Sequence, residues 1–363
     1  MAQQEGSKSV RILDRHIGLH VVRDSLLTLL TLLTIFSLVE FLDDLSDVGK
    51  GRYTIGAAVE YMLLTTPNRI FILFPIAGVI GSLIGLGSLA AHRELVVIRA
   101  TGVSSLRIAG AAMKAAVVLV VASVLVGEVV SPYTEQLAHQ RRATALSDDH
   151  ALGTGNGFWI RDGNSFINVG QVLPGNRMNA LYIYEFDDEH RLRVATYADY
   201  GIYENGEWTL EGIRQSIIGE DGVIGRNVVE ADWRSRFKPE LADVVSVPLA
   251  SLSIPGLMRY IDYLKSNGLD TARYELALWS KIIHPLTTVV MIFIALPLVL
   301  GRLGSVGIGQ RILAGIVIAV SFLLMEQLAG HLGLAFGLDP MTAACAPTLL
   351  FFALAVWMFR RVG

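Results

Sequence analysis

The chain has 363 residues, of which 52% are hydrophobic and only 17% are charged, and its formal net charge is -3. This composition excludes an ordinary soluble domain and is typical of a membrane protein, and without a basic tail a nucleic-acid partner is not expected. The single cysteine, Cys345, excludes a disulfide within the chain. The first 15 residues have no apolar core or small-residue cleavage site. We therefore expect no cleaved signal peptide.

Six apolar segments are long enough to cross a bilayer, whose hydrocarbon core takes about 20 residues of helix. Three of them precede the middle of the chain and three follow it. The second is too long for one straight span, and Pro67 and Pro75 are expected to kink it. The six predicted spans are Leu19–Leu42, Ala57–Ala90, Ile108–Val130, Ile282–Leu300, Ile312–Leu334 and Met341–Phe359.

Lysines and arginines in the short connections predict the orientation, because such residues stay on the cytoplasmic side. With six spans, four basic sets fall on one side, whereas the opposite connection at 333–340 has neither lysine nor arginine. We therefore predict that both termini are cytoplasmic and that residues from about 135 to 270 lie outside the cytoplasm. The basic sets are Lys8, Arg11 and Arg15; Arg93, Arg99 and Arg107; Arg302 and Arg311; and Arg360 and Arg361.

Between Gly153 and Val247 the sequence changes to short β-rich runs separated by turn sequences. Several short strands at regular spacing predict a sandwich, a jelly roll or an open barrel, and Asn205-Gly206 is the strongest hairpin signal. No nucleophile–His–acid pattern and no metal-ligand spacing occurs in this stretch. We therefore predict a binding or conduit module with an open sheet edge or an apolar groove, not a hydrolase.

The predicted fold is thus an α-helical membrane protein with six transmembrane helices and an inserted all-β domain. The expected domains are residues 1–135 with the first three spans and a cytoplasmic loop at 91–104, residues 136–252 with the β domain, and residues 253–363 with the remaining spans. The last part begins with Ser253–Asn267, which is predicted to form an amphipathic helix at the membrane surface.

The cytoplasmic loop at 91–104 is the natural docking point for an energy-supplying partner. The chain has no G-x-x-x-x-G-K-[ST] motif, so it cannot hydrolyse a nucleotide by that route. The loop combines apolar and charged residues. This mixture is typical of a short helix that presents both kinds of side chain to another protein. An amphipathic turn lying on the membrane is the open alternative.

The loop sequence at Arg93–Ile108, RELVVIRATGVSSLRI, resembles the coupling segment of the lipopolysaccharide export permeases, the LptF/LptG family. The start, Leu13–Gly18, resembles the LptG branch rather than the LptF branch. Further segments that resemble LptG sequences occur in the same order along nearly the whole chain, at Phe74–Ala90, Gly157–Gly163, Leu252–Gly256 and Arg273–Lys281.

The resemblance implies a permease subunit of an ATP-driven transporter that extracts lipopolysaccharide from the bacterial inner membrane. It implies a β-jellyroll in the periplasm and a second, LptF-like permease subunit. It also implies an LptB-like ATPase dimer on the cytoplasmic loops, an LptC-like single-helix protein at a lateral gate and an LptA-like bridge that receives the lipid. The chain itself is then not an enzyme and binds no cofactor, since ATP and Mg belong to the ATPase. The alternatives are an LptF-type subunit, a membrane scaffold or sensor with a β ectodomain, and a proton-driven transporter.

Glu94 matches the family's coupling acid, which engages the ATPase. Its neighbours Arg93, Leu95, Arg99 and Gly102 complete the candidate coupling residues. A solvated charge on a helix is the alternative interpretation of Glu94.

The candidate substrate contacts match the family less well. Where the family can carry lysines that face the phosphates of lipid A, this chain has Glu40, Ser46 and Asp47. A divalent cation could bridge these acids, Lys50 and Arg52 could take over, or the lipid could carry less phosphate. Arg142 matches a basic position of the family, and His139 replaces a neighbouring basic residue.

Further candidates lie within the spans. Glu128, Lys281, His284 and Glu326 are ionisable residues in or near the membrane, which makes each a candidate for function. Glu326 is expected to face the cavity or an interhelical partner. Phe36, Leu38, Phe41 and Phe322 are candidates for contacts with acyl chains, and packing against lipid or in the core is equally compatible with them.

Overall fold

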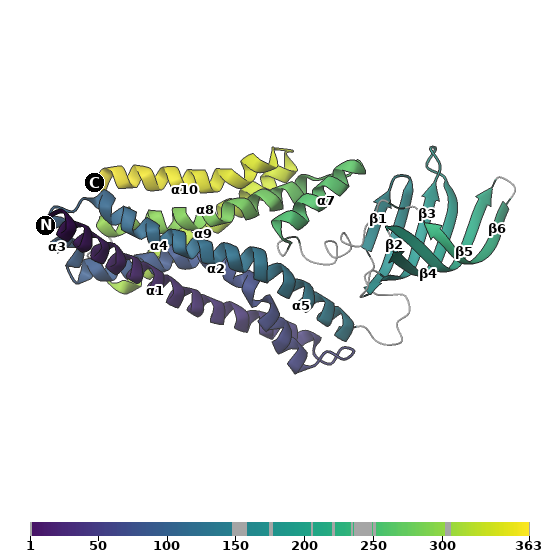
Figure 1. Cartoon of the computed structure of the whole chain (residues 1–363), viewed down its shortest axis with the longest axis horizontal. Helices are drawn as coiled ribbons and strands as arrows, with labels where there is room; N and C mark the ends of the chain where they lie inside the picture. The colour runs from purple at the N-terminus through teal and green to yellow at the C-terminus, as the bar shows by residue number, and fades with distance from the viewer. Residues whose placement is uncertain are drawn as a thin grey trace.

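The computed structural model of the chain describes residues 2–146, 158–173, 177–204, 206–219, 222–233, 235, 249, 252–301 and 306–362. Figure 1 shows a long helical body with both termini at one end and a β domain beyond the other. We call these ends of the helical body the terminal end and the domain end. Asn205 of the predicted hairpin turn and Arg302 lie outside the described residues, whereas Gly206 has the positive φ of 92° that a tight turn requires.

Within the described residues, six helices are long and apolar enough to cross a membrane, which confirms the predicted spans. The first two are α1 (Ala2–Asp44) and α2 (Ile55–Ala91), which runs continuously through Pro67 and Pro75. The third consists of α4 (Ser105–Leu125), a π-helical turn η2 (Val126–Val130) and α5 (Ser131–Leu146), so it extends 16 residues beyond the predicted end. The last three are α8 (Ala272–Leu300), α9 (Ile308–Ala335) and α10 (Pro340–Val362).

Helix α2 forms the centre of the helical body, and the helices around it differ in how much apolar surface they bury. In the most apolar stretch of each span, 78% of the residues are buried in α2, but only 11% in the first span and 17% in α9. Exposed leucines, isoleucines and valines cover the outer faces of α1 and α9. A bilayer or another chain must cover these faces, because exposing so large an apolar surface to water is unfavourable.

Glycines let α2 approach its neighbours within the chain. A methyl group on Gly81 would overlap the backbone of Ser25 in α1, and one on Gly85 would lie 2.7 Å from the His20 carbonyl oxygen. Gly78 faces α8, where a methyl group would lie 3.1 Å from the side chain of Ile292. The small-residue face of α2 therefore packs inside this chain, as small faces do between membrane helices.

Replacing Gly81 by alanine is expected to lower the unfolding free energy by about 2 kcal/mol or more, because α1 and α2 would have to separate. Gly110→Ala is the matched control, since a methyl group there meets no atom within 4 Å and alanine favours a helix. The thermal midpoint of each variant in detergent measures the effect. Equal midpoints for the two variants would contradict the close packing of α1 on α2.

The β domain confirms the prediction of an inserted all-β module. The described residues contain six strands in one antiparallel sheet in the order β1-β2-β3-β4-β5-β6, in which each strand pairs with the next along the chain. This meander has none of the strand-skipping pairs of a jelly roll among its described residues. The strands are β1 (Phe158–Asp162), β2 (Ser165–Leu173), β3 (Arg177–Phe186), β4 (Leu192–Glu204), β5 (Glu207–Gly219) and β6 (Gly222–Trp233).

One face of the sheet is apolar and buried, and a short amphipathic helix packs against it. This helix, α7 (Ile254–Ser266), matches the prediction and contributes Tyr260 and Tyr263 to the buried face, which includes Leu181 and Trp208. Tyr263 donates a hydrogen bond from its hydroxyl to the Arg161 carbonyl oxygen at 2.8 Å. Burial raises the pKa of the Tyr263 phenol, so this donor keeps its proton.

A buried ion pair ties the start of α7 to the helical body. The Lys281 ammonium of α8 lies 3.0 Å from a carboxylate oxygen of Glu128 in η2 and donates to the Leu252 carbonyl oxygen at 2.5 Å. The other Glu128 oxygen accepts the Ile254 backbone N–H at 2.9 Å. Two of the four predicted ionisable residues in or near the membrane thus hold one joint between η2, α8 and α7. His284 donates a hydrogen bond from Nε2 to the Phe71 carbonyl oxygen, 2.8 Å away.

Candidate functional site

A short helix projects between α2 and α4 at the terminal end. It is α3 (Glu94–Ala100), and it begins at a sharp turn in which Arg93 has a left-handed φ of 61°. After α3, Gly102 provides a second turn with a φ of 90°. The two turns fix the direction of the seven-residue helix, because left-handed residues reverse the chain abruptly.

Glu94 is exposed at the start of α3 and is in contact with α1. Its carboxylate lies 2.8 Å from His16 Nε2, and both side chains keep 45% of their surface in water. His16 lies in the Leu13–Gly18 segment, but nothing in the sequence indicated its contact with Glu94, which is 78 residues away. An exposed pair of this kind contributes little to stability, so Glu94 remains accessible to a partner.

The apolar residues of α3 do not all face outward as predicted. Leu95 is only 3% exposed and packs into the core of the helical body, so it anchors α3 and cannot present apolar surface. Val96 and Val97 are 62% and 61% exposed and replace Leu95 as the candidate apolar contacts. Arg99 and Gly102, at the other end of α3, lie beside α8 and α10 rather than beside α1.

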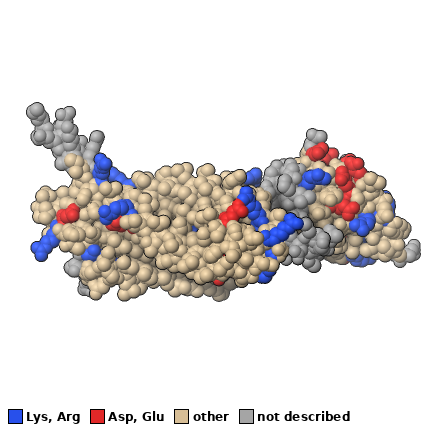
Figure 2. Space-filling view, turned by 90° about the horizontal axis from the view of Figure 1, so that it is seen from below, with Lys and Arg blue, Asp and Glu red and all other residues tan. Residues whose placement is uncertain are grey.

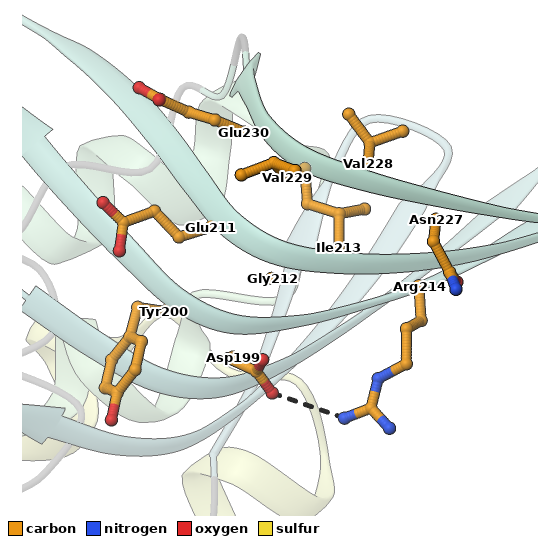
Figure 3. Close-up of a pocket in the computed structure, with 10 residues that line it drawn as sticks. All are labelled: Asp199, Tyr200, Glu211, Gly212, Ile213, Arg214, Asn227, Val228, Val229 and Glu230. Carbon is orange, nitrogen blue, oxygen red and sulfur yellow. Dashed lines mark hydrogen bonds and ion pairs between the residues drawn. The ribbon is translucent and has the colours of Figure 1, made fainter.

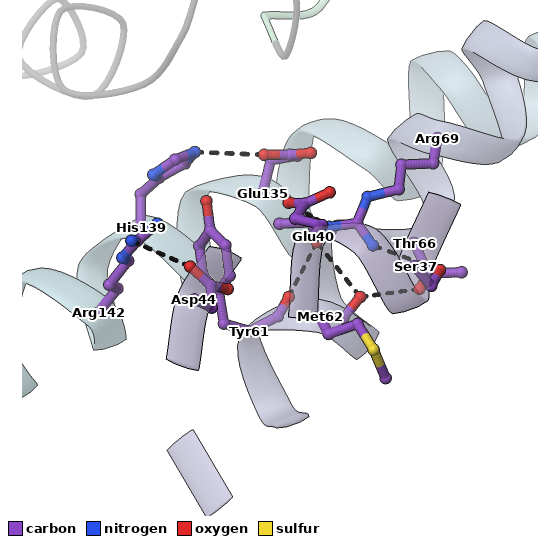
Figure 4. Close-up of polar contacts among 11 residues, drawn as sticks. Ser37, Glu40, Asp44, Tyr61, Met62, Thr66, Arg69, Glu135, His139 and Arg142 are labelled. Carbon is purple, nitrogen blue, oxygen red and sulfur yellow. Dashed lines mark hydrogen bonds and ion pairs between the residues drawn. The ribbon is translucent and has the colours of Figure 1, made fainter. Parts of the chain in front are cut away.

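At the domain end, several polar side chains of the first three spans meet (Figure 4). Arg142 of α5 lies 3.0 Å from Asp44 at the end of α1 and 2.7 Å from Asp47, and its guanidinium stacks over Tyr61 of α2 at 4.7 Å. Asp44 is buried, with only 5% of its side chain exposed. Arg142 therefore neutralises two acids of its own chain.

The other candidate headgroup residues are paired as well. Glu40 forms an ion pair with Arg69, Asp47 also binds Lys50 at 2.7 Å, and His139 lies 3.3 Å from Glu135. Arg52 is exposed, and its backbone N–H donates to the Ala145 carbonyl oxygen at 2.7 Å. Glu40 and Asp47, the two acids at the positions where the family can carry lysines, thus each have a basic partner. No sequence signal pointed to Arg69, Asp44 or Tyr61, because their roles depend on contacts between spans.

Arg142→Gln is expected to lower the unfolding free energy by about 2 kcal/mol, because Asp44 would be left buried without its partner. Arg141→Gln is the control, since Arg141 pairs with Glu60 at an exposed position and a surface ion pair contributes little. Thermal unfolding in detergent separates the two. If Arg142→Gln is as stable as Arg141→Gln, the buried pair is not a structural element and Arg142 is free for a headgroup.

The remaining candidates in the spans divide into exposed and buried side chains. Phe36 is 50% exposed on α1, and Phe41 is half-buried. Phe322 is only 4% exposed and packs edge-on against Phe351, with the ring centroids 5.2 Å apart, so of its two interpretations the structure supports packing in the core. Glu326 is half-buried on α9 and has no hydrogen-bond or ion-pair partner among the described residues.

The β domain carries a shallow polar cleft of about 610 Å³ over β4, β5 and β6 (Figure 3). Gly212 has a φ of 67° there and leaves room for Asp199, which forms an ion pair with Arg214 at 3.3 Å. Glu211 and Glu230 line the same cleft. Its largely acidic lining does not suit a phosphorylated lipid.

The charges on the surface match a protein that crosses a membrane. On the face shown in Figure 2, charged residues gather towards the two ends of the helical body and on the β domain, and a broad band between them has almost none. The family model described as lipopolysaccharide export system permease LptF/LptG matches residues 15–361. The chain belongs to the LptF/LptG family. It is therefore a multi-pass membrane protein of the lipopolysaccharide export permeases, as the resemblance of its Arg93–Ile108 segment predicted.

Two relatives that the chain matches over nearly its whole length are LptG proteins. The lipopolysaccharide export system permease protein LptG of Haemophilus influenzae is 36% identical over 354 residues, which cover 97% of this chain and 99% of the relative. The protein of the same name in Escherichia coli is 35% identical over 353 residues, which cover 96% of this chain and 98% of the relative. The predicted likeness to the LptG branch of the LptF/LptG family is thereby confirmed.

Proposed function

We propose that this chain is the LptG-type half of an ATP-driven extractor of lipopolysaccharide in the bacterial inner membrane. The terminal end then lies in the cytoplasm and the β domain in the periplasm. An LptF-like chain covers the exposed faces, an LptB-like ATPase dimer docks on α3, and an LptC-like helix stands at the lateral gate. The lipid leaves through the β domain towards an LptA-like bridge. ATP and Mg are bound by the ATPase alone.

The observation that carries this proposal is α3 itself. Two left-handed turns and the buried Leu95 hold the helix at the terminal end, while Glu94, Val96 and Val97 face outward. One carboxylate beside two apolar side chains gives a partner both a charge and a hydrophobic contact. Leu95 links α3 to the core that α1, α2 and α8 share, so a displacement of α3 reaches the spans.

The exposed faces of α1 and α9 support the transport step. With a homologous partner they would enclose a cavity that a lipid enters sideways from the outer leaflet, and closure by the ATPase would force the lipid upward. Moving acyl chains out of a bilayer costs about 0.8 kcal/mol per CH₂, so the step requires external energy and an apolar acceptor. The β domain has exposed apolar side chains suited to that acceptor in Val223, Ile224 and Val229 of β6.

Purification of the tagged chain from its native membrane in mild detergent, followed by mass spectrometry, tests the proposal. We expect a small soluble ATPase, an LptF-like chain and lipopolysaccharide to accompany it. Another membrane complex from the same preparation serves as the control for mild extraction. Recovery of the chain alone beside an intact control would overturn the proposal and favour a scaffold, or a proton-driven transporter that uses Glu326.

A further inference from the structure

A second cavity, separate from the cleft of the β domain, lies at the terminal end of the helical body. It has a volume of about 730 Å³ and is bounded by the end of α3, the start of α4, α8 and the end of α10. Arg99 and Gly102 belong to the candidate coupling residues, but the proposed transport step assigns no ligand to the cavity itself. Its lining divides into a cationic part, formed by Arg99 and Arg360, and an apolar part, formed by Phe293, Val356 and Phe359.

The two arginines of the cavity are available to a ligand. Arg99 and Arg360 are exposed, and neither has an ion-pair or hydrogen-bond partner within the described part of the chain. None of the described lining residues is acidic. Two unpaired guanidinium groups in one cavity create a local positive potential, and a guanidinium binds a phosphate through paired N–H groups. The Ser105 side chain adds a hydroxyl to the lining at the start of α4.

The apolar part of the cavity decides between a free anion and a lipid. Phe293 lies within α8, while Val356 and Phe359 belong to α10, so the cavity reaches from the ends of the spans into the apolar region of the helical body. An inorganic phosphate would leave these side chains without a partner. An anionic glycerophospholipid has the matching arrangement, because its phosphate lies at the membrane surface and its acyl chains lie below it.

We propose that this cavity binds an anionic glycerophospholipid of the leaflet at the terminal end, with Arg99 and Arg360 on the phosphate and Phe293 and Phe359 beside the acyl chains. The lipid would connect α3 to α10 and fill the space beside α8. The site is independent of the proposed export substrate, which belongs to the domain end. It gives α3 a second support besides Leu95 and the contact of Glu94 with His16.

The test uses the full chain in detergent with whatever subunits accompany it. Phosphatidylglycerol is added, and native mass spectrometry measures how much lipid is retained. We expect Arg99→Gln and Arg360→Gln each to weaken retention by about three- to tenfold, since a charge-assisted contact contributes about 1 kcal/mol or more. The double variant should lose retention by at least tenfold, and phosphatidylcholine should be retained less than phosphatidylglycerol by the unmodified chain.

Arg361→Gln is the matched control, because it removes the same charge from the same helix end. Arg361 stacks on Trp357 at 3.9 Å and does not line the cavity, so this variant should retain phosphatidylglycerol normally. Equal loss in Arg361→Gln would overturn the proposal in favour of unspecific attraction. Inorganic phosphate that competes fully with the lipid would overturn it in favour of a simple anion site. Loss of an accompanying protein in the double variant, with unchanged retention of phosphatidylglycerol, would assign the cavity to that protein.

Discussion

Exchanging Glu94 for lysine is expected to stop lipopolysaccharide export while the chain stays folded and in the membrane. Under the proposed function, Glu94 is the charge that α3 presents to the ATPase, and reversal places a like charge against a basic partner surface. Like-charge contacts at an interface cost several kcal/mol, so we expect coupled ATP hydrolysis to fall at least tenfold. Reconstituted ATPase activity and lipid release from vesicles are the measurements.

The contact of Glu94 with His16 requires its own control, since Glu94→Lys removes that contact as well. Both side chains are 45% exposed at a distance of 2.8 Å, and an exposed pair contributes at most about 1 kcal/mol. His16→Gln should therefore change export by less than about threefold. If His16→Gln is as defective as Glu94→Lys, the role of Glu94 is to hold α3 on α1 rather than to contact the ATPase.

Val96 and Val97 provide a further control for the same surface. An aspartate at either position adds a charge to the exposed side of α3 without changing Leu95, which anchors the helix. These variants should lower ATPase docking and leave the thermal midpoint unchanged. Normal docking would place the partner contact elsewhere on the loop.

The spans were predictable because a bilayer forces long apolar runs on any helix that crosses it. The orientation of side chains within those runs was not, because lipid and protein interiors are equally apolar. Phe36 and Phe322 are both phenylalanines in predicted spans, yet one is half exposed and the other packs against Phe351. No hydrophobic pattern distinguishes two such positions.

The spacing of the apolar residues in α3 indicates which face of this helix is buried. Leu95 and Ile98 are three residues apart and both pack towards the core, whereas Val96 and Val97 lie on the other side. Residues at that spacing share one helix face. The contacts of the domain end had no comparable signal, because Arg142 and Asp44 come from different spans and meet only after the helices pack.

Removing the ammonium of Lys281 should destabilise the joint between the helical body and the β domain. Only 6% of the Lys281 side chain is exposed, and Lys281→Met leaves both the Glu128 carboxylate and the Leu252 carbonyl oxygen without their shared donor. Breaking a buried pair from one side costs about 3 kcal/mol or more. Thermal and detergent-induced unfolding measure this loss, and Lys265→Met is the matched control. Lys265 of α7 pairs with Glu275 of α8 at 2.8 Å but is exposed, so we expect no measurable change.

The double variant Lys281→Met with Glu128→Gln separates a buried charge from a mere loss of packing. A glutamine at position 128 can still accept the Ile254 backbone N–H, while it carries no charge that needs Lys281. We therefore expect the double variant to be more stable than Lys281→Met alone, since residues in contact are not additive. Additive losses would mean that the two side chains stabilise the joint separately. Recovery would mean that the loss in Lys281→Met comes from the buried Glu128 charge left without its partner, so that Lys281 and Glu128 act as one coupled pair at this joint.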